Sequence, residues 1–79
     1  MFPDEIRKLI KDGISDAEVT VQSEDNTHYN AIIVSDSFAG KSLIQRHQMV
    51  YECLGQAVGN EIHALSLKTH TSDELKPKD

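Results

Sequence analysis

Residues 17–34 have the sequence AEVTVQSEDNTHYNAIIV, and this stretch decides the fold. Apolar residues occupy alternate positions in Ala17–Gln22, which predicts a strand with one buried face and one face in water. The polar segment Ser23–Asn26 then predicts a turn. The stretch therefore begins as the first half of a β-hairpin.

The second half of this stretch predicts a central strand. It runs from His28 or Tyr29 to Val34, and apolar residues occur on both of its sides. Two-sided apolar character is typical of a strand that is covered on both faces, at least in part. We expect the two strands to pair antiparallel through the polar turn.

Two helices are predicted, one on each side of the hairpin in the sequence. The first covers Pro3–Asp12, and Gly13 is a natural stop. The second runs from Leu43 to Val58 with Ser42 as its N-cap, and its sequence is compatible with a break near Arg46. The expected inner stripe of the second helix consists of Leu43, Ile44, His47, Val50, Tyr51, Leu54, Ala57 and Val58.

A third strand, Ile62–Lys68, completes the predicted sheet, and Thr71-x-x-Glu74 resembles a capping box for one last helical turn. Because a helix joins the second and third strands, these two strands are expected to be parallel neighbours. The expected fold class is α/β (α+β). It is a three-stranded mixed sheet packed against helices, in the order α-β-β-α-β with a short C-terminal helical turn.

Size and composition predict a small adaptor or binding domain rather than an enzyme. The chain has 79 residues and a net charge of −5, so we expect one domain over residues 1–79 and a field that repels nucleic acid. Catalytic motifs such as Gly-x-Ser-x-Gly or a phosphate-binding glycine loop do not occur in the sequence. No apolar run approaches the roughly 20 residues that span a bilayer, and there is no signal peptide, so we expect a cytoplasmic protein without membrane contact.

The histidines are the candidate ligands. Parallel second and third strands begin at the same edge of the sheet, so the turn Asp25–His28 is expected to approach His63. The residues alone leave His63 open between a core and a ligand role. His47 lies in the middle of the helix stripe and is expected to be buried and hydrogen-bonded, while Cys53 is expected to be a small packed thiol. With four histidines and one cysteine at these spacings, the chain cannot build a closed zinc or iron–sulfur site alone.

The chain resembles the BolA-like family. The resemblance is carried by the segment 38–51, FAGKSLIQRHQMVY, by the segment 62–69, IHALSLKT, and by Thr27-His28-Tyr29. It covers nearly the whole chain and is greatest for the short bacterial IbaG (YrbA) type. It implies a class II KH-like fold and a monothiol glutaredoxin partner with a Cys-Gly-Phe-Ser motif. It also implies a [2Fe-2S] cluster that is held only in complex with glutaredoxin and glutathione, in iron–sulfur trafficking and iron homeostasis, and that is absent from the isolated chain.

The resemblance places the family's ligand histidine at His63. Many relatives carry a second ligand, Cys or His, in the turn before the second strand, where this chain has Asp25, a harder ligand. Three alternatives remain open: His28 replaces it, Asp25 ligates weakly, or His63 serves alone. A second interpretation is a transcriptional regulator that binds DNA weakly through Lys41 and Arg46, although the Gly-x-x-Gly loop of KH domains does not occur.

Overall fold

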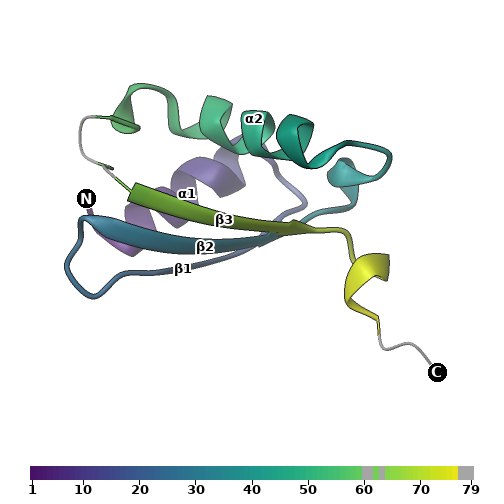
Figure 1. The fold of residues 1–79 in the computed structure, drawn as a ribbon, viewed down its shortest axis with the longest axis horizontal. Coiled ribbons are helices and arrows are strands. Elements are labelled where there is room, and N and C mark those ends of the chain that lie inside the picture. Colours follow the sequence, from purple (N-terminus) through teal and green to yellow (C-terminus); the bar gives the residue numbers. More distant parts are fainter. Residues whose placement is uncertain (60–61, 63, 77–79) are drawn as a thin grey trace.

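The computed structural model describes residues 1–59, 62 and 64–76. Three strands, β1 (Glu18–Gln22), β2 (His28–Val34) and β3 (Ala64–His70), form one sheet in the order β1-β2-β3. β1 and β2 are antiparallel and β2 and β3 are parallel, as Figure 1 shows. This confirms the predicted topology, with the second strand at the centre.

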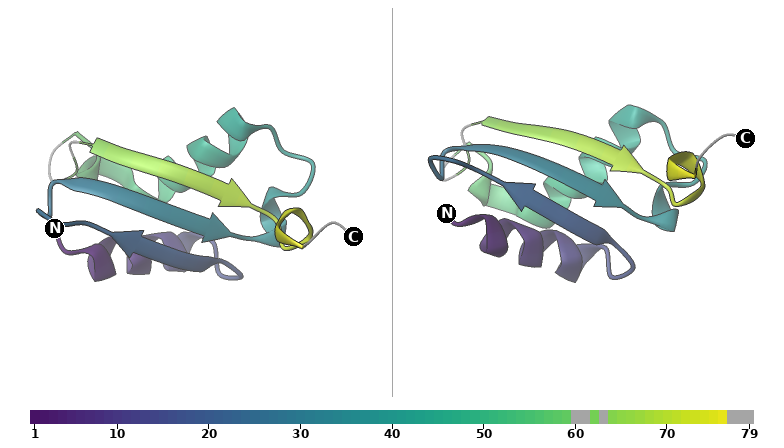
Figure 2. Two further views of the ribbon diagram at one scale, coloured as in Figure 1. Left: turned by 60° about the horizontal axis from the view of Figure 1, so that its bottom comes forward. Right: turned by 90° about the horizontal axis from the view of Figure 1, so that it is seen from below.

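Both helices cover the same face of the sheet. α1 (Pro3–Gly13) and α2 (Leu43–Leu54) lie side by side on that face, and Figure 2 shows the strands from the other side. The core between the two layers is built mainly from aliphatic side chains and two aromatic rings. It consists of Ile6, Ile10, Ile14, Ala17, Tyr29, Ala31, Ile33, Phe38, Val50, Leu54 and Ile62.

The opposite face of β2 is open, which corrects the expectation of a strand covered on both faces. Burial alternates strictly along β2, and Ile32 is 42% exposed. Ile32 and Val34 satisfy the strong preference of β-branched residues for the pleated backbone of a central strand. Their presence therefore reflects strand propensity and does not indicate a second covering layer.

α2 is shorter than predicted, and its buried row is narrower. The helix ends at Leu54 because Gly55 follows with a positive φ of 55°, and it runs without a break at Arg46. The buried side chains of α2 are Val50 and Leu54. Four members of the expected stripe are instead exposed, namely Leu43, Ile44, Tyr51 and Val58.

The C-terminal part of the sheet is displaced by two residues from the prediction. β3 begins at Ala64 instead of Ile62, because Ile62 is buried in the core and forms an isolated bridge with Val58. The predicted capping box is confirmed: the Glu74 carboxylate accepts the backbone N–H of Thr71 at 3.0 Å. The Thr71 hydroxyl in turn accepts the backbone N–H of Glu74 at 3.3 Å, and the short helix η3 (Asp73–Leu75) follows.

The close approach of α1 and α2 yields a stability prediction. A Cβ atom added at Gly13 would lie 2.4 Å from the Sγ atom of Cys53. We therefore expect Gly13→Ala to lower the free energy of unfolding by about 1–3 kcal/mol, as overpacking does. Without the clash, Gly→Ala within a helix stabilises by about 1 kcal/mol, so the sign of the change is informative. Urea denaturation measures it.

Cys53→Ala supplies the control for this prediction. It removes the sulfur that Gly13→Ala would meet, so the double variant should recover part of the loss, as two contacting residues do in a double-mutant cycle. A Gly13→Ala chain that is as stable as the wild type, or a loss that Cys53→Ala does not relieve, would contradict the packing argument.

Candidate functional site

The turn between β1 and β2 is organised by one carboxylate. Oδ1 of Asp25 accepts the backbone N–H of Thr27 at 3.0 Å and that of His28 at 2.9 Å. The Ser23 hydroxyl lies 3.4 Å from the same oxygen and donates to the His28 carbonyl at 2.7 Å. Asn26 adopts a positive φ of 56°, which is the left-handed conformation that Asn tolerates in turns. The polar segment is therefore an ordered turn.

The second oxygen of Asp25 holds the side chain of His28. Nδ1 of His28 lies 2.8 Å from Oδ2 of Asp25, and the two side chains are 70% and 51% exposed. Hydrogen bonds hold the pKa of the Asp25 carboxyl well below its usual range. The backbone N–H of His28 contributes most, followed by the His28 ring and then by the N–H of Thr27. Asp25 is therefore an ionised acceptor, and His28 is fixed on an accessible surface.

The parallel pairing of β2 and β3 brings the start of β3 to this turn. Ala64 is the cross-strand partner of His28. His63, the predicted ligand, lies outside the described residues, and its role stays a prediction. Its neighbour in the chain, Ala64, is nevertheless at the edge of the sheet that carries Asp25 and His28.

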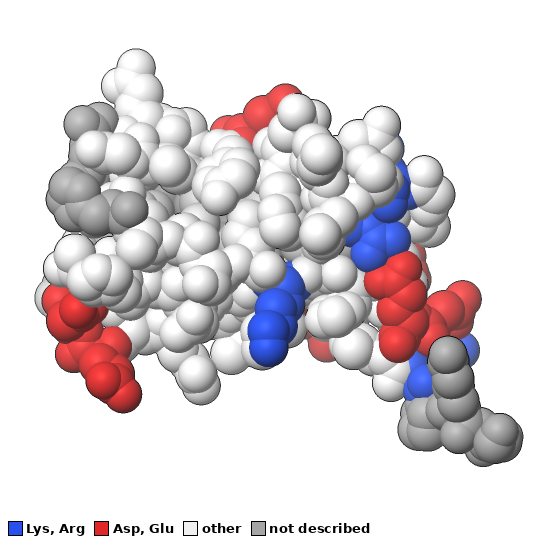
Figure 3. Space-filling view, viewed as in Figure 1, with Lys and Arg blue, Asp and Glu red and all other residues white. Residues whose placement is uncertain are grey.

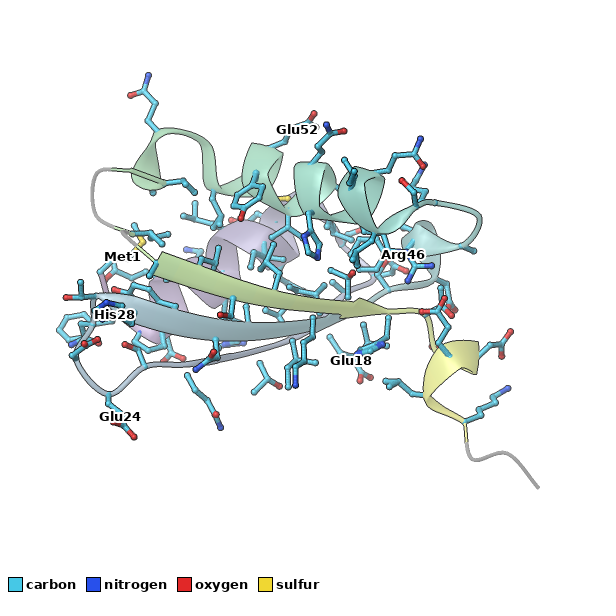
Figure 4. All side chains as sticks on the ribbon, in the orientation of Figure 1. Met1, Glu18, Glu24, His28, Arg46 and Glu52 are labelled. Atoms are coloured by element: carbon cyan, nitrogen blue, oxygen red, sulfur yellow. The ribbon has the colours of Figure 1, made fainter. Side chains whose placement is uncertain are left out.

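A surface hollow of about 440 Å³ lies beside the turn. Gln22 and Asn30, which are cross-strand partners, line it together with His28. In Figure 4 the His28 side chain lies at the end of the molecule where this turn projects, and Glu24 points away from it into solvent. The imidazole is therefore open to a partner that approaches this end.

The structure does not bring Lys41 and Arg46 together as an open basic pair. Both terminal nitrogens of Arg46 bind the Glu74 carboxylate, at 2.7 and 2.8 Å, and its Nε donates to the Lys41 carbonyl at 3.1 Å. The Arg46 side chain is only 12% exposed, and its guanidinium lies 5.8 Å from the centre of the Phe38 ring. Figure 3 shows blue and red atoms in contact at this end of the molecule.

The Arg46–Glu74 pair has a structural role. The guanidinium of Arg46, followed by the backbone N–H of Thr71, lowers the pKa of Glu74 to about 2. Together with a bond from the Ser72 N–H to Asp36 at 3.2 Å, this pair holds η3 against the rest of the domain. Arg46, one of the two cations predicted to bind DNA, is therefore already neutralised within the chain.

The other candidate side chains are packed. His47 is half-buried rather than buried, and its Nε2 makes no hydrogen bond to any residue that the structure describes, which corrects the expectation of a buried, hydrogen-bonded ring. The Cys53 thiol donates to the Met49 carbonyl at 3.2 Å, and burial raises its pKa. Neither a reactive thiolate nor an open imidazole is found in α2.

A polar cluster around Asp16 was not predicted from the sequence. The Asp16 carboxylate accepts the hydroxyls of Ser35 and Ser37 at 2.7 and 3.0 Å and the N–H of Asp36 at 3.2 Å. These hydrogen bonds lower the pKa of Asp16, and the bond from the Ser35 hydroxyl contributes most. The cluster ties the loop after α1 to the short helix η1 (Asp36–Phe38) at the end of β2. Its groups bond one another, so we assign it to fold stability.

The described residues contain neither a cluster of metal ligands nor a membrane-spanning helix. Within residues 1–59, 62 and 64–76, no three His, Cys, Asp or Glu side chains converge in a way that could hold a metal ion. In the same residues, none of the helices has the length and apolar character needed to cross a bilayer.

Comparison with known proteins gives one consistent family. The sequence model of the family described as BolA-like protein matches residues 6–74. The chain is 40% identical over 58 residues to Protein BOLA1, chloroplastic, of Arabidopsis thaliana, with 73% of this chain and 36% of that protein covered. It is 35% identical over 54 residues to the DNA-binding transcriptional regulator BolA of Escherichia coli, with 68% and 51% covered. The chain thus spans about a third to a half of these relatives.

A solved structure agrees with the whole fold. The structure of a bolA protein homologue from Coxiella burnetii superimposes with a TM-score of 0.83 at 36% identity, and the match covers 94% of this chain and 95% of that one. The likeness therefore includes both helices and all three strands.

Proposed function

Because this chain belongs to the BolA-like family, we propose that it is a non-enzymatic adaptor that pairs with a monothiol glutaredoxin and shares a [2Fe-2S] cluster with it. The cluster is the cargo, and the adaptor serves in iron–sulfur trafficking and iron homeostasis. The partner has the Cys-Gly-Phe-Ser motif, and its cysteine, with glutathione, supplies the thiolates that this chain lacks.

The observation that supports this function is the exposed imidazole of His28 at the edge of the sheet where β3 begins. Ala64 pairs with His28 across the strands, and His63 directly precedes Ala64 in the chain. Imidazole nitrogens replace thiolates at one iron of Rieske-type [2Fe-2S] centres, so histidine is chemically suited to a shared cluster. In this proposal His63 is the main ligand of the chain.

The test is the visible absorption spectrum of the chain purified anaerobically with its own monothiol glutaredoxin. We expect the chain alone to be colourless and free of stoichiometric iron, because the cluster needs thiolates from elsewhere. The pair should be coloured, with a spectrum that differs from that of the glutaredoxin alone. A brown, cluster-loaded monomer, or a mixture whose spectrum is the sum of its parts, would overturn the adaptor function.

A second candidate function is nucleic-acid binding, which the name of the Escherichia coli relative favours. Two observations weigh against it in this chain. The net charge is −5, and Arg46 is paired with Glu74. Of the two cations assigned to this function, Lys41 alone is exposed and outside an ion pair among the described residues.

We expect any DNA binding to be weak and to fall steeply with salt concentration, because it rests on few phosphate contacts. A mobility-shift titration at physiological salt measures it, with Lys41→Ala as the variant. Tight, sequence-specific binding that Lys41→Ala weakens would favour the regulator over the adaptor.

A further inference from the structure

The Asp25–His28 pair decides which atom this chain offers at the turn. An ionised carboxylate only accepts hydrogen bonds, so a ring nitrogen that contacts it must carry the proton. Nδ1 of His28 lies 2.8 Å from Oδ2 of Asp25 and is therefore the protonated nitrogen. In the neutral ring, Nε2 then holds the free lone pair.

That lone pair is accessible. The His28 side chain is 70% exposed, and no described residue bonds its Nε2. Around metal-bound histidines, a carboxylate commonly accepts the N–H of the ring nitrogen that does not bind the metal, and so fixes the tautomer and orientation of the ring. The ring of His28 is thus held in the state that a metal centre requires before any metal arrives.

Asp25 itself is poorly placed to ligate. One of its oxygens accepts the N–H groups of Thr27 and His28, and the other holds the imidazole. Ligation through either oxygen would break bonds that order the turn, and a carboxylate is a harder ligand than iron–sulfur chemistry favours. The geometry therefore separates the two residues into a ligand and its support.

We infer that Asp25 is a positioning residue that presents Nε2 of His28 as the second ligand of this chain to the shared cluster. This inference rests on the proposed function for the identity of the metal centre. The tautomer of His28 can be measured without it, so the two can fail separately.

The decisive variant is Asp25→Asn. The side-chain carbonyl of Asn can still accept the turn N–H groups, but its NH₂ group would then face Nδ1 and make that nitrogen the acceptor. The variant should keep the turn and invert the tautomer. Glu24→Gln is the matched control, because it removes one charge from the same turn at a side chain that points away from His28.

The first measurement is a long-range ¹H–¹⁵N correlation spectrum of the metal-free chain, at a pH about two units above the ordinary imidazole pKa of roughly 6.5. We expect the Nδ1–H tautomer at His28 in the wild type and in Glu24→Gln, and the Nε2–H tautomer in Asp25→Asn. A wild-type ring with its proton on Nε2 would overturn the positioning role.

The second measurement is pulsed EPR of the reduced shared cluster, with ¹⁵N-histidine in this chain only. Wild type and Glu24→Gln should show coupling from two histidines, and His28→Ala from one. Asp25→Asn should weaken cluster sharing about 10–100-fold, as loss of such support does at other metal sites. Two couplings in His28→Ala would remove His28 as a ligand, whereas a wild-type mixture without a shared cluster would refute the proposed function alone.

Discussion

A His63→Ala chain mixed with a cluster-bearing monothiol glutaredoxin should lack the visible spectrum that marks the shared cluster. The resemblance to the BolA-like family places the ligand histidine at this position. Alanine replaces the imidazole with a methyl group, which has no nitrogen that could bind iron. A cluster iron that loses a protein ligand has no nearby thiol in this chain as a substitute, since Cys53 is held in the packing between α1 and α2. We therefore expect complete loss of the signal.

The control is His70, the histidine that lies in β3. It ends β3, at the opposite end from Ala64, and pairs with Val34. His70→Ala removes an imidazole from β3 and should leave the spectrum of the mixture intact. Circular dichroism must show that both variants are folded. A His63→Ala complex with the wild-type spectrum would remove this residue from the ligand set and leave His28 to be tested as the main ligand.

The hairpin and the topology could be predicted because they depend on short-range periodicity. Strict alternation over Ala17–Gln22 and the polar segment after it specify an antiparallel pair, and a helix between two strands specifies a parallel one. The edge of the sheet that carries the candidate site follows from this order alone. The proximity of Asp25 and His28 to the start of β3 was therefore available from the sequence.

The bond between Asp25 and His28 could not be predicted, since it depends on the backbone of the turn. It requires Asn26 in a left-handed conformation, which folds three residues tightly enough for the carboxylate to reach the ring. The polar run gave a turn but no turn type. A Ser-x-Asp pattern before the strand was the available signal, because short polar side chains bond the backbone two or three residues ahead.

The misplaced basic patch has a different cause. Arg46 is neutralised by Glu74, which is 28 residues away in the chain, and no local pattern predicts that pairing. The width of the buried row on α2 was overestimated for a similar reason. Leu43 and Ile44 lie at helical spacing, but α2 contacts the sheet mainly through its later turns, where Val50 and Leu54 are buried.

The largest effect on stability is expected at Phe38. Its ring is fully buried in η1, where the chain leaves β2, and the Arg46 guanidinium lies over it at 5.8 Å. Phe38→Ala should lower the free energy of unfolding by about 3–5 kcal/mol, the usual cost of a large cavity in a core. At roughly 0.05–0.15 kcal/mol per residue, a domain of 79 residues has on the order of 4–12 kcal/mol in total. The substitution therefore removes about a quarter of the stability or more.

Phe38→Leu keeps this prediction testable if the alanine variant does not fold. Leucine refills most of the cavity, so the leucine variant should unfold at a urea concentration between those of Phe38→Ala and the wild type. It should also loosen η3 less, because Arg46 keeps an apolar surface to lie on while it binds Glu74. Amide exchange at Thr71 and Glu74, whose N–H groups form the capping box, reports that loosening directly. Wild-type stability in Phe38→Ala would show that η1 is not part of the cooperative core.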